Sequence, residues 1–216
     1  MSKLDATVRS WSPETAFGAL TSRRRRQLFV LVNEYDGVGR SQLTVDELAR
    51  HLATVSECGD RSSCRINLVH QELPMLEEAG VIDWDRSAGT VSVPAHLSFD
   101  TSFIERTLES DKLDWDAVFE ALSNERRRTV LTVLKETTEA LSLETLAKRV
   151  AAHELGAAEH TVATTLHHQH LPVLREAGLV SEQADGFQYT GEILERSGID
   201  TNFQVPTTPI MAHAQD

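Results

Sequence analysis

The side chains best suited to do chemistry form a short polar series at helical spacing in the C-terminal half of the chain. They fall at positions i, i+3, i+4 and i+7 and are Thr161, Thr164, Thr165 and His168. Residues at this spacing share one face of a helix. Hydroxyl and imidazole groups both donate and accept hydrogen bonds, which is the chemistry needed to contact the edges of DNA bases. The alternative is an ordinary solvated helix face.

A matching series lies 98 residues earlier in the chain. It comprises Ser63, Asn67 and His70, with Arg61 and Arg65 nearby. Ser and Asn read base edges, and Arg pairs with guanine. The later series has Glu159 and Ala163 where the earlier one has the two arginines. If both contact DNA, we expect the earlier one to supply more affinity; otherwise the later one serves dimerisation or effector sensing.

These two series belong to a repeat that covers most of the chain. Phe17–Val32 (FGALTSRRRRQLFVLV) corresponds to Phe119–Leu134 (FEALSNERRRTVLTVL), 102 residues later. Leu68–Asp83 corresponds to Leu166–Ser181, 98 residues later, which predicts a short loop insertion near Asn33–Gln42 in the first copy. Each copy has roughly 80 residues, enough to fold alone. The sequence therefore predicts a tandem of two related domains.

Both copies carry a run of arginines, Arg23–Arg26 and Arg126–Arg128, at the expected start of a helix. The helix dipole disfavours positive charge there, so something must offset this cost. Arg25 and Arg127 share a face with buried apolar residues, and we expect them to be half buried and paired with carboxylates. The other arginines point elsewhere, toward DNA phosphates or toward surface carboxylates: Arg24, Arg26, Arg126 and Arg128.

The second copy also contains a cluster of histidines. Within the His167-His168-Gln169-His170 segment, His167 and His170 form the only good i, i+3 pair for a shared metal ion. The first copy has Val69 and Glu72 at these two positions. We therefore predict no metal site.

The two cysteines, Cys58 and Cys64, suggest no thiol chemistry. Cys64 aligns with Val162, a predicted core position, and is expected to act as a small buried hydrophobe. Cys58 lies in a polar loop. The chain has no glycine-rich phosphate loop, no nucleophile elbow and no HExxH pattern. We expect no enzyme and no cofactor.

Apolar spacing and capping residues predict the same elements in both copies. In the second copy we expect helices over 115–122, up to Leu134 after the capping pair Ser123-Asn124, over 142–155 and over about 160–177, ending at Gly178. A β-hairpin follows around Ala184-Asp185-Gly186, and another surrounds Ser87-Ala88-Gly89 in the first copy. Pro74 and Pro172 predict a bend in the last helix of each copy.

These elements give the expected domain boundaries. The prediction is an N-terminal tail (1–12), a first domain (13–95), a linker (96–113), a second domain (114–196) and a mobile C-terminal tail (197–216). The linker is expected to hold a short helix over Thr101–Glu109 that docks through Phe103, Ile104 and Leu108. The fold class is mainly α with small β-hairpins.

Helices followed by a hairpin are the plan of a winged helix-turn-helix domain. FEALSNERRRTVL and HLPVLREAGLV resemble the corresponding stretches of ArsR-type regulators, in which Arg127 and Arg25 match the motif's arginine. The full pattern, LSNxRRR with HxHLPxLxxAGLV, looks most like a haloarchaeal winged-helix family of unassigned function. The resemblance covers about 70–80 residues of each copy. It implies tandem winged helix-turn-helix domains that bind DNA.

Composition indicates an environment of concentrated salt. The formal net charge is −12, and Lys is confined to positions 3, 112, 135 and 148 among 21 basic residues. Many carboxylates and little Lys suit a halophile, because self-repulsion costs little when the Debye length is short. The alternative is an ordinary acidic protein. With no secretory signal or membrane span in the sequence, we expect a cytoplasmic protein.

These observations predict a DNA-binding transcriptional regulator in a halophilic archaeon. Its partner would be double-stranded DNA, and its two domains would act as a pseudo-dimer on major grooves about 34 Å apart. A protein partner or a homodimer stays open. The rival prediction is a winged-helix protein–protein adaptor that does not bind DNA, since acidity opposes the usual electrostatic attraction to phosphates.

Overall fold

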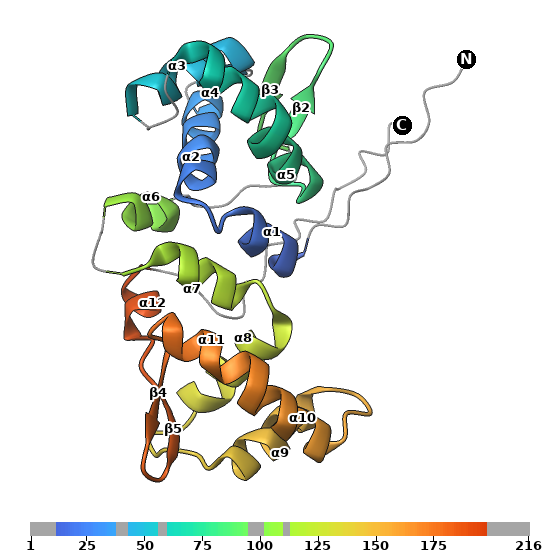
Figure 1. The fold of residues 1–216 in the computed structure, drawn as a ribbon, viewed down its shortest axis with the longest axis vertical. Coiled ribbons are helices and arrows are strands. Elements are labelled where there is room, and N and C mark those ends of the chain that lie inside the picture. Colours follow the sequence, from blue (N-terminus) through green and yellow to red (C-terminus); the bar gives the residue numbers. More distant parts are fainter. Residues whose placement is uncertain (1–11, 38–42, 56–59, 95–101, 110–112, 198–216) are drawn as a thin grey trace, which may run out of the picture.

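The computed structural model describes residues 12–37, 43–55, 60–94, 102–109 and 113–197. Nearly all of both expected tails, Cys58 and the end of the predicted loop insertion lie outside these residues. The described part is mainly helical and has two small antiparallel sheets. It forms two units, one above the other along the long axis: unit one (12–94) and unit two (113–197) (Figure 1). Within the described residues, no helix combines the length and apolar character that a bilayer crossing requires.

Unit one contains eight helical or strand elements around a π-helical turn, η1. They are α1 (Pro13–Ala19), α2 (Arg23–Gly37), β1 (Leu43–Thr44), α3 (Val45–Val55), α4 (Arg61–Asn67), η1 (Leu68–Glu72), α5 (Leu73–Glu78), β2 (Asp83–Asp85) and β3 (Thr90–Ser92). The sheet order is β1-β3-β2, with Val91 opposite both Leu43 and Trp84. The predicted hairpin is confirmed, and β1 adds a third strand that the sequence did not predict.

Unit two repeats this order with an isolated bridge between Leu141 and Phe187 in place of β1, and it adds a final helix. Its elements are α7 (Trp115–Leu122), α8 (Glu125–Lys135), α9 (Leu143–His153), α10 (Glu159–Thr165), η2 (Leu166–His170), α11 (Leu171–Glu176), β4 (Val180–Gln183), β5 (Gly186–Tyr189) and α12 (Glu192–Ser197). The side chains of Asn124 and Ser142 accept hydrogen bonds from the backbone N–H groups of Arg127 and Thr145. Both predicted helix caps and the predicted hairpin are therefore confirmed.

The long helix that precedes the hairpin of each unit, α4–η1–α5 or α10–η2–α11, contains a π-helical turn next to its proline. In η1 the N–H of Leu73 bonds to the carbonyl of Leu68, and in η2 the N–H of Leu171 bonds to that of Leu166. Proline has no N–H, and its ring clashes with the carbonyl four residues earlier. The wider turn accommodates Pro74 and Pro172 without ending the helix. The bend predicted from the prolines thus takes this form.

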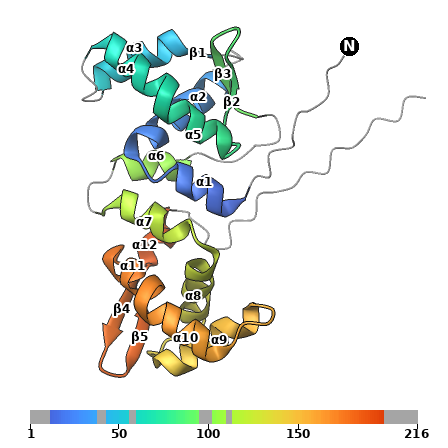
Figure 2. The same ribbon diagram turned by 45° about the vertical axis from the view of Figure 1, so that its right-hand side comes forward.

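Helix α6 (Ser102–Glu109) joins the two units, as its apolar spacing predicts. Phe103 and Ile104 are buried, and Leu108 packs against the same core. The Arg23 guanidinium donates a hydrogen bond of 2.7 Å from Nη2 to the carbonyl of Leu108. Two views show α6 and α1 on the unit-one side of α7, midway along the molecule (Figure 1, Figure 2).

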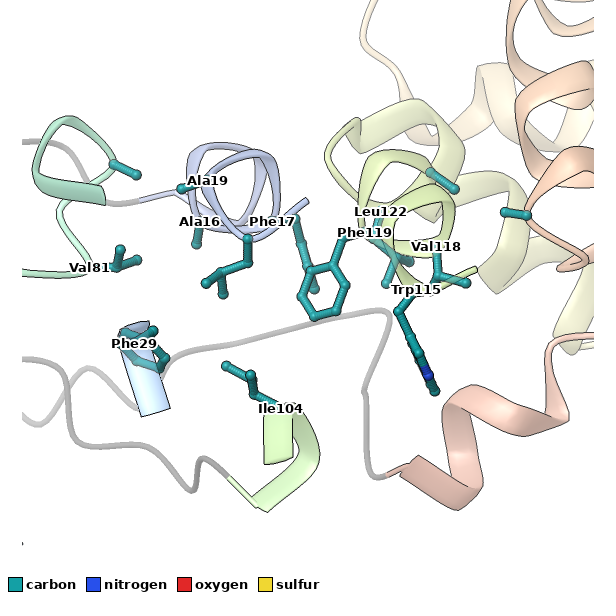
Figure 3. Close-up of a cluster of buried hydrophobic side chains, with 14 of the residues drawn as sticks. Ala16, Phe17, Ala19, Phe29, Val81, Ile104, Trp115, Val118, Phe119 and Leu122 are labelled. Carbon is teal, nitrogen blue, oxygen red and sulfur yellow. The ribbon is translucent and has the colours of Figure 1, made fainter. Parts of the chain in front are cut away.

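The units meet through the equivalent helices α1 and α7, which lie side by side (Figure 3). Phe17 and Phe119, equivalent residues of the repeat, face each other with ring centroids 5.9 Å apart. Arg26 of unit one pairs with Asp116 of unit two at 2.8 Å. The Glu14 carboxylate, equivalent to Asp116, accepts a 2.7 Å hydrogen bond from the N–H of Glu125. Equivalent surfaces therefore meet, as in the interface of a two-fold dimer.

Candidate functional site

Unit one exposes the polar side of α4 and η1. Cys64 and Leu68 hold this helix to the core and are at most 1% exposed. The predicted residues lie on the rest of the helix surface: Arg61, Ser63, Arg65 and His70 are exposed, and Asn67 is partly buried. The N-cap Asp60 accepts a 2.8 Å hydrogen bond from the N–H of Ser63, which fixes the start of the helix. The structure thus brings these five residues together.

Both arginines of α4 contact one carboxylate, Asp46 in the first turn of α3. Arg65 Nε lies 3.0 Å and Arg61 Nη2 lies 3.5 Å from the Asp46 oxygens. All three side chains are more than half exposed. Such pairs contribute only about 0–1 kcal/mol in water. The arginines are therefore held in place by a contact that a DNA phosphate or base could replace.

A groove of about 630 Å³ separates this helix from the β2–β3 hairpin. Arg65 lines it on the helix side, and Trp84 and Arg86 line it on the hairpin side. The Arg86 guanidinium stacks on Trp84 at 4.2 Å and pairs with Glu77 at 2.6 Å. Arg86, Trp84 and Asp46 were not among the residues predicted from the sequence. A cation in the hairpin tip, WDRSAG, was the signal that could have identified Arg86.

In unit two the equivalent surface carries less positive charge. Thr161, Thr164 and His168 are exposed on α10 and η2, as predicted. Thr165 is partly buried and accepts a 2.9 Å hydrogen bond from Arg126, so it contacts α8 instead of solvent. The hairpin side chain Glu182 pairs with Arg175 at 2.6 Å.

Arg126 also corrects the expectation of a free phosphate contact. Its guanidinium makes a two-point pair with Glu154, with distances of 2.6 and 2.5 Å. This hydrogen-bonded pair raises the pKa of Arg126 and lowers the pKa of Glu154. In unit one, Arg24 has only a 3.6 Å contact with Glu72. Both arginines therefore lie beside carboxylates, and of these Glu154 is partly exposed whereas Glu72 is buried.

The contacts of the remaining arginines explain why arginine runs occur at the starts of α2 and α8. The guanidinium groups donate to carbonyls at or just after the C-terminal ends of α1 and α7: Arg25 to Ala19, Arg26 to Leu20 and Thr21, Arg127 to Ala121 and Glu120, and Arg128 to Leu122. Carbonyls at a helix C-terminus lack partners within the helix and carry partial negative charge. The positive charge that α2 and α8 disfavour is thus stabilised by the end of the preceding helix. Arg25 and Arg127 are mostly buried beside Glu72 and Glu120, as predicted.

Arg26 does not reach the surface, contrary to the prediction. Its side chain is 2% exposed, stacks on Phe119 at 4.9 Å and pairs with Asp116. Burial lowers the pKa of Arg26, and the hydrogen bond to Asp116 opposes that shift. Arg128 is partly buried; burial lowers its pKa, while Glu14 acts in the opposite direction. Both residues lie at the junction between the units, so neither belongs to the candidate interface.

The histidine cluster is divided by burial. His167 and His168 are exposed, whereas His170 is 8% exposed and its buried Nδ1 makes no hydrogen bond within the described structure. Burial first, and then Arg126 and Arg127, lower the pKa of His170. No group of three metal ligands occurs among the described residues.

Cys64 is buried, as its alignment with Val162 predicts. It is disulfide-bonded, however, so it does not act as a free small hydrophobe. Its place on the inner side of α4 removes it from the exposed surface that carries Arg61 and Arg65.

Comparison with known proteins gives one family. No curated protein and no solved structure matches the chain. A family model described as "Domain of unknown function (DUF7344)" matches residues 17–92 and 119–187. The two matched segments fall in unit one and unit two, and together they cover more than half of the chain. The chain therefore belongs to the DUF7344 domain family.

Proposed function

We propose that this protein is a non-catalytic, DNA-binding transcriptional regulator built from two winged helix-turn-helix units. In this proposal α4–η1 and α10–η2 are the recognition helices, and the β2–β3 and β4–β5 hairpins are the wings. The observation that carries the proposal is the exposed set of Arg61, Ser63, Arg65 and His70 on a helix whose other side is buried. A helix of this kind fits the major groove of B-DNA.

The position of the hairpin supports this function. Arg86 lies on the hairpin, across a groove from Arg65 of the helix. The two elements therefore offer cations from two directions. Phosphate contacts position a protein on the duplex, while helix side chains read the bases.

The way in which the two units are joined also supports binding to two major grooves. Equivalent helices α1 and α7 join them, and the two hairpins lie on opposite sides of the long axis (Figure 1). Helix-turn-helix dimers with two-fold symmetry place two recognition helices in successive major grooves. Here one chain would supply both helices.

The net charge of −12 is compatible with this function when salt is concentrated. Counterion release supplies little affinity at high ionic strength, so base contacts and surface fit must carry the binding.

The test is selection of bound fragments from sheared genomic DNA of the source organism in molar potassium chloride. Wild type is compared with an Arg61→Ala/Arg65→Ala/Asn67→Ala variant and with Lys135→Ala, which removes a cation that pairs with Glu195 outside the proposed interface. We expect a shared motif with wild type and Lys135→Ala, and its loss with the triple variant. Circular dichroism checks that each variant is folded.

The adaptor function is the second candidate. It is favoured by the acidic surface of unit two, where Glu159 and Glu182 occupy the places of Arg61 and Trp84. The adaptor would replace the regulator proposal if two results were obtained together. The folded wild-type protein would enrich no DNA motif, and wild type and the triple variant would capture a protein partner equally well.

A further inference from the structure

We infer that the DNA target of this chain is asymmetric: two unlike half-sites, bound by the two units of a single chain, with the guanine-containing half under unit one. This inference rests on the proposed function and specifies its substrate. It has three supports, namely a fixed junction between the units, unlike recognition helices and unlike hairpins.

The junction holds the two units in one arrangement. Phe17 and Phe119 are buried between α1 and α7, and Ile104 of α6 is fully buried beside them (Figure 3). The buried guanidinium of Arg26 is tied to Asp116 across the junction. Protein interiors with this packing do not deform continuously. Both helices are thus presented at one separation, and a second copy of the chain is not needed to supply the second helix.

The helices differ where they are most exposed. The side chains of Arg61 and Arg65 are 51% and 56% exposed. Unit two has Glu159 and Ala163 at the equivalent positions. Arginine contacts the O6 and N7 atoms of guanine, whereas glutamate and alanine do not. The exposed Ile66 is likewise replaced by Thr164. The two units therefore cannot prefer the same base sequence.

The hairpins differ in the same direction. Unit one has Trp84 and Arg86, stacked on one another, at the positions where unit two has Glu182 and Ala184. A cation near a phosphate attracts DNA, and a carboxylate repels it. Unit one consequently contributes more of the affinity, while unit two adds specificity through Thr164 and His168.

The experiment is a selection of randomised DNA duplexes, long enough for two helical turns, by the whole chain in molar potassium chloride. Two variants each damage one unit: Arg61→Ala/Arg65→Ala and Thr164→Ala/His168→Ala. Lys135→Ala is the matched control, and native mass spectrometry counts the chains on each selected duplex.

We expect a motif with two different halves at one fixed spacing, bound by one chain. The arginine variant should lose the guanines of one half and bind the selected duplex about tenfold or more weakly. The threonine–histidine variant should lose the other half and bind about threefold more weakly.

A palindromic motif bound by two chains would overturn the inference and leave the proposed function standing. Selection of a single half-site whose binding does not change in Thr164→Ala/His168→Ala would also overturn the inference and leave the proposed function standing. Absence of any enriched motif and of any duplex binding by folded wild type would overturn the proposed function itself, and the inference with it.

Discussion

Unit one and unit two use their arginine runs in the same way but differ at one buried position beside the run. In both, the arginine run donates to the end of the preceding helix. Unit one places the carboxylate of Glu72 next to Arg24 and Arg25. Unit two has His170 at that position, and Arg126 takes its carboxylate from Glu154 instead. The arginine run is thus a structural feature of the domain, while its carboxylate partner is free to change.

Truncating the junction between the units should produce the largest effect. Phe119→Ala removes a fully buried ring and should lower the free energy of unfolding by about 3–5 kcal/mol. Phe17→Ala, the equivalent change in unit one, should cost a similar amount. Urea denaturation measures both. A cost below 1 kcal/mol for only one of them would show that the junction is not reciprocal.

The two equivalent carboxylates at the junction, Asp116 and Glu14, should contribute unequally to stability. Asp116→Ala leaves the buried Arg26 guanidinium without its carboxylate, and among the described residues its Nε has no hydrogen-bond partner. We expect a loss of about 1–3 kcal/mol in the free energy of unfolding. Glu14→Ala removes an exposed carboxylate that accepts from the N–H of Glu125 and acts electrostatically on Arg128, and it should cost less than about 1 kcal/mol. Equal losses in urea denaturation would contradict this ranking.

The substitution of Glu72 by His170 should make unit two sensitive to acid. Burial lowers the pKa of His170 below its ordinary value of 6.5, so the unfolded chain binds this proton first as pH falls. The resulting contribution to stability is complete above about pH 6.5 and is lost as pH falls toward the folded pKa. Unfolding free energies measured across this range should fall less steeply for His170→Gln.

The exposed His168→Gln is the matched control and should keep the wild-type dependence. Parallel curves for wild type and His170→Gln would remove His170 as the cause.

The smallest effect is expected at Asp46. Asp46→Asn releases Arg61 and Arg65 and should tighten DNA binding about two- to fivefold at moderate salt, in line with an exposed ion pair. Glu144→Gln is the equivalent change in unit two. It should leave affinity for DNA unchanged, because unit two has Ala163 where unit one has Arg65. Fluorescence anisotropy on the selected duplex measures both. Weaker binding by Asp46→Asn would mean that Asp46 positions the arginines for contact.

The helices could be predicted because their signals are local. Asn124 and Ser142 mark helix starts, and Gly178 has the positive φ of a helix C-terminus. Strand β1 was missed because two residues show no alternation, and it exists only through pairing with β3.

The candidate site was predictable only in part, for a related reason. Exposure of Arg61 and His70 follows from the helical pattern around Cys64 and Leu68. Burial of Arg26 depends on Asp116, which lies in the other unit, and no local pattern contains that contact. The stacking of Arg86 on Trp84 depends in the same way on the hairpin bringing the two side chains together.

The π-helical turns set the rotation of each proposed recognition helix relative to the helix that follows it. One residue corresponds to about 100° of rotation in an α-helix. Pro172→Ala without any deletion, if it converted η2 into a continuous α-helix, would rotate Thr161 and Thr164 by about that angle relative to the buried α11, because the π-helical turn absorbs one extra residue. In the proposed regulator, the π-helical turn thus sets which side chains of α10 face the DNA, and an additional deletion of Gln169 would return Thr161 and Thr164 to their original direction.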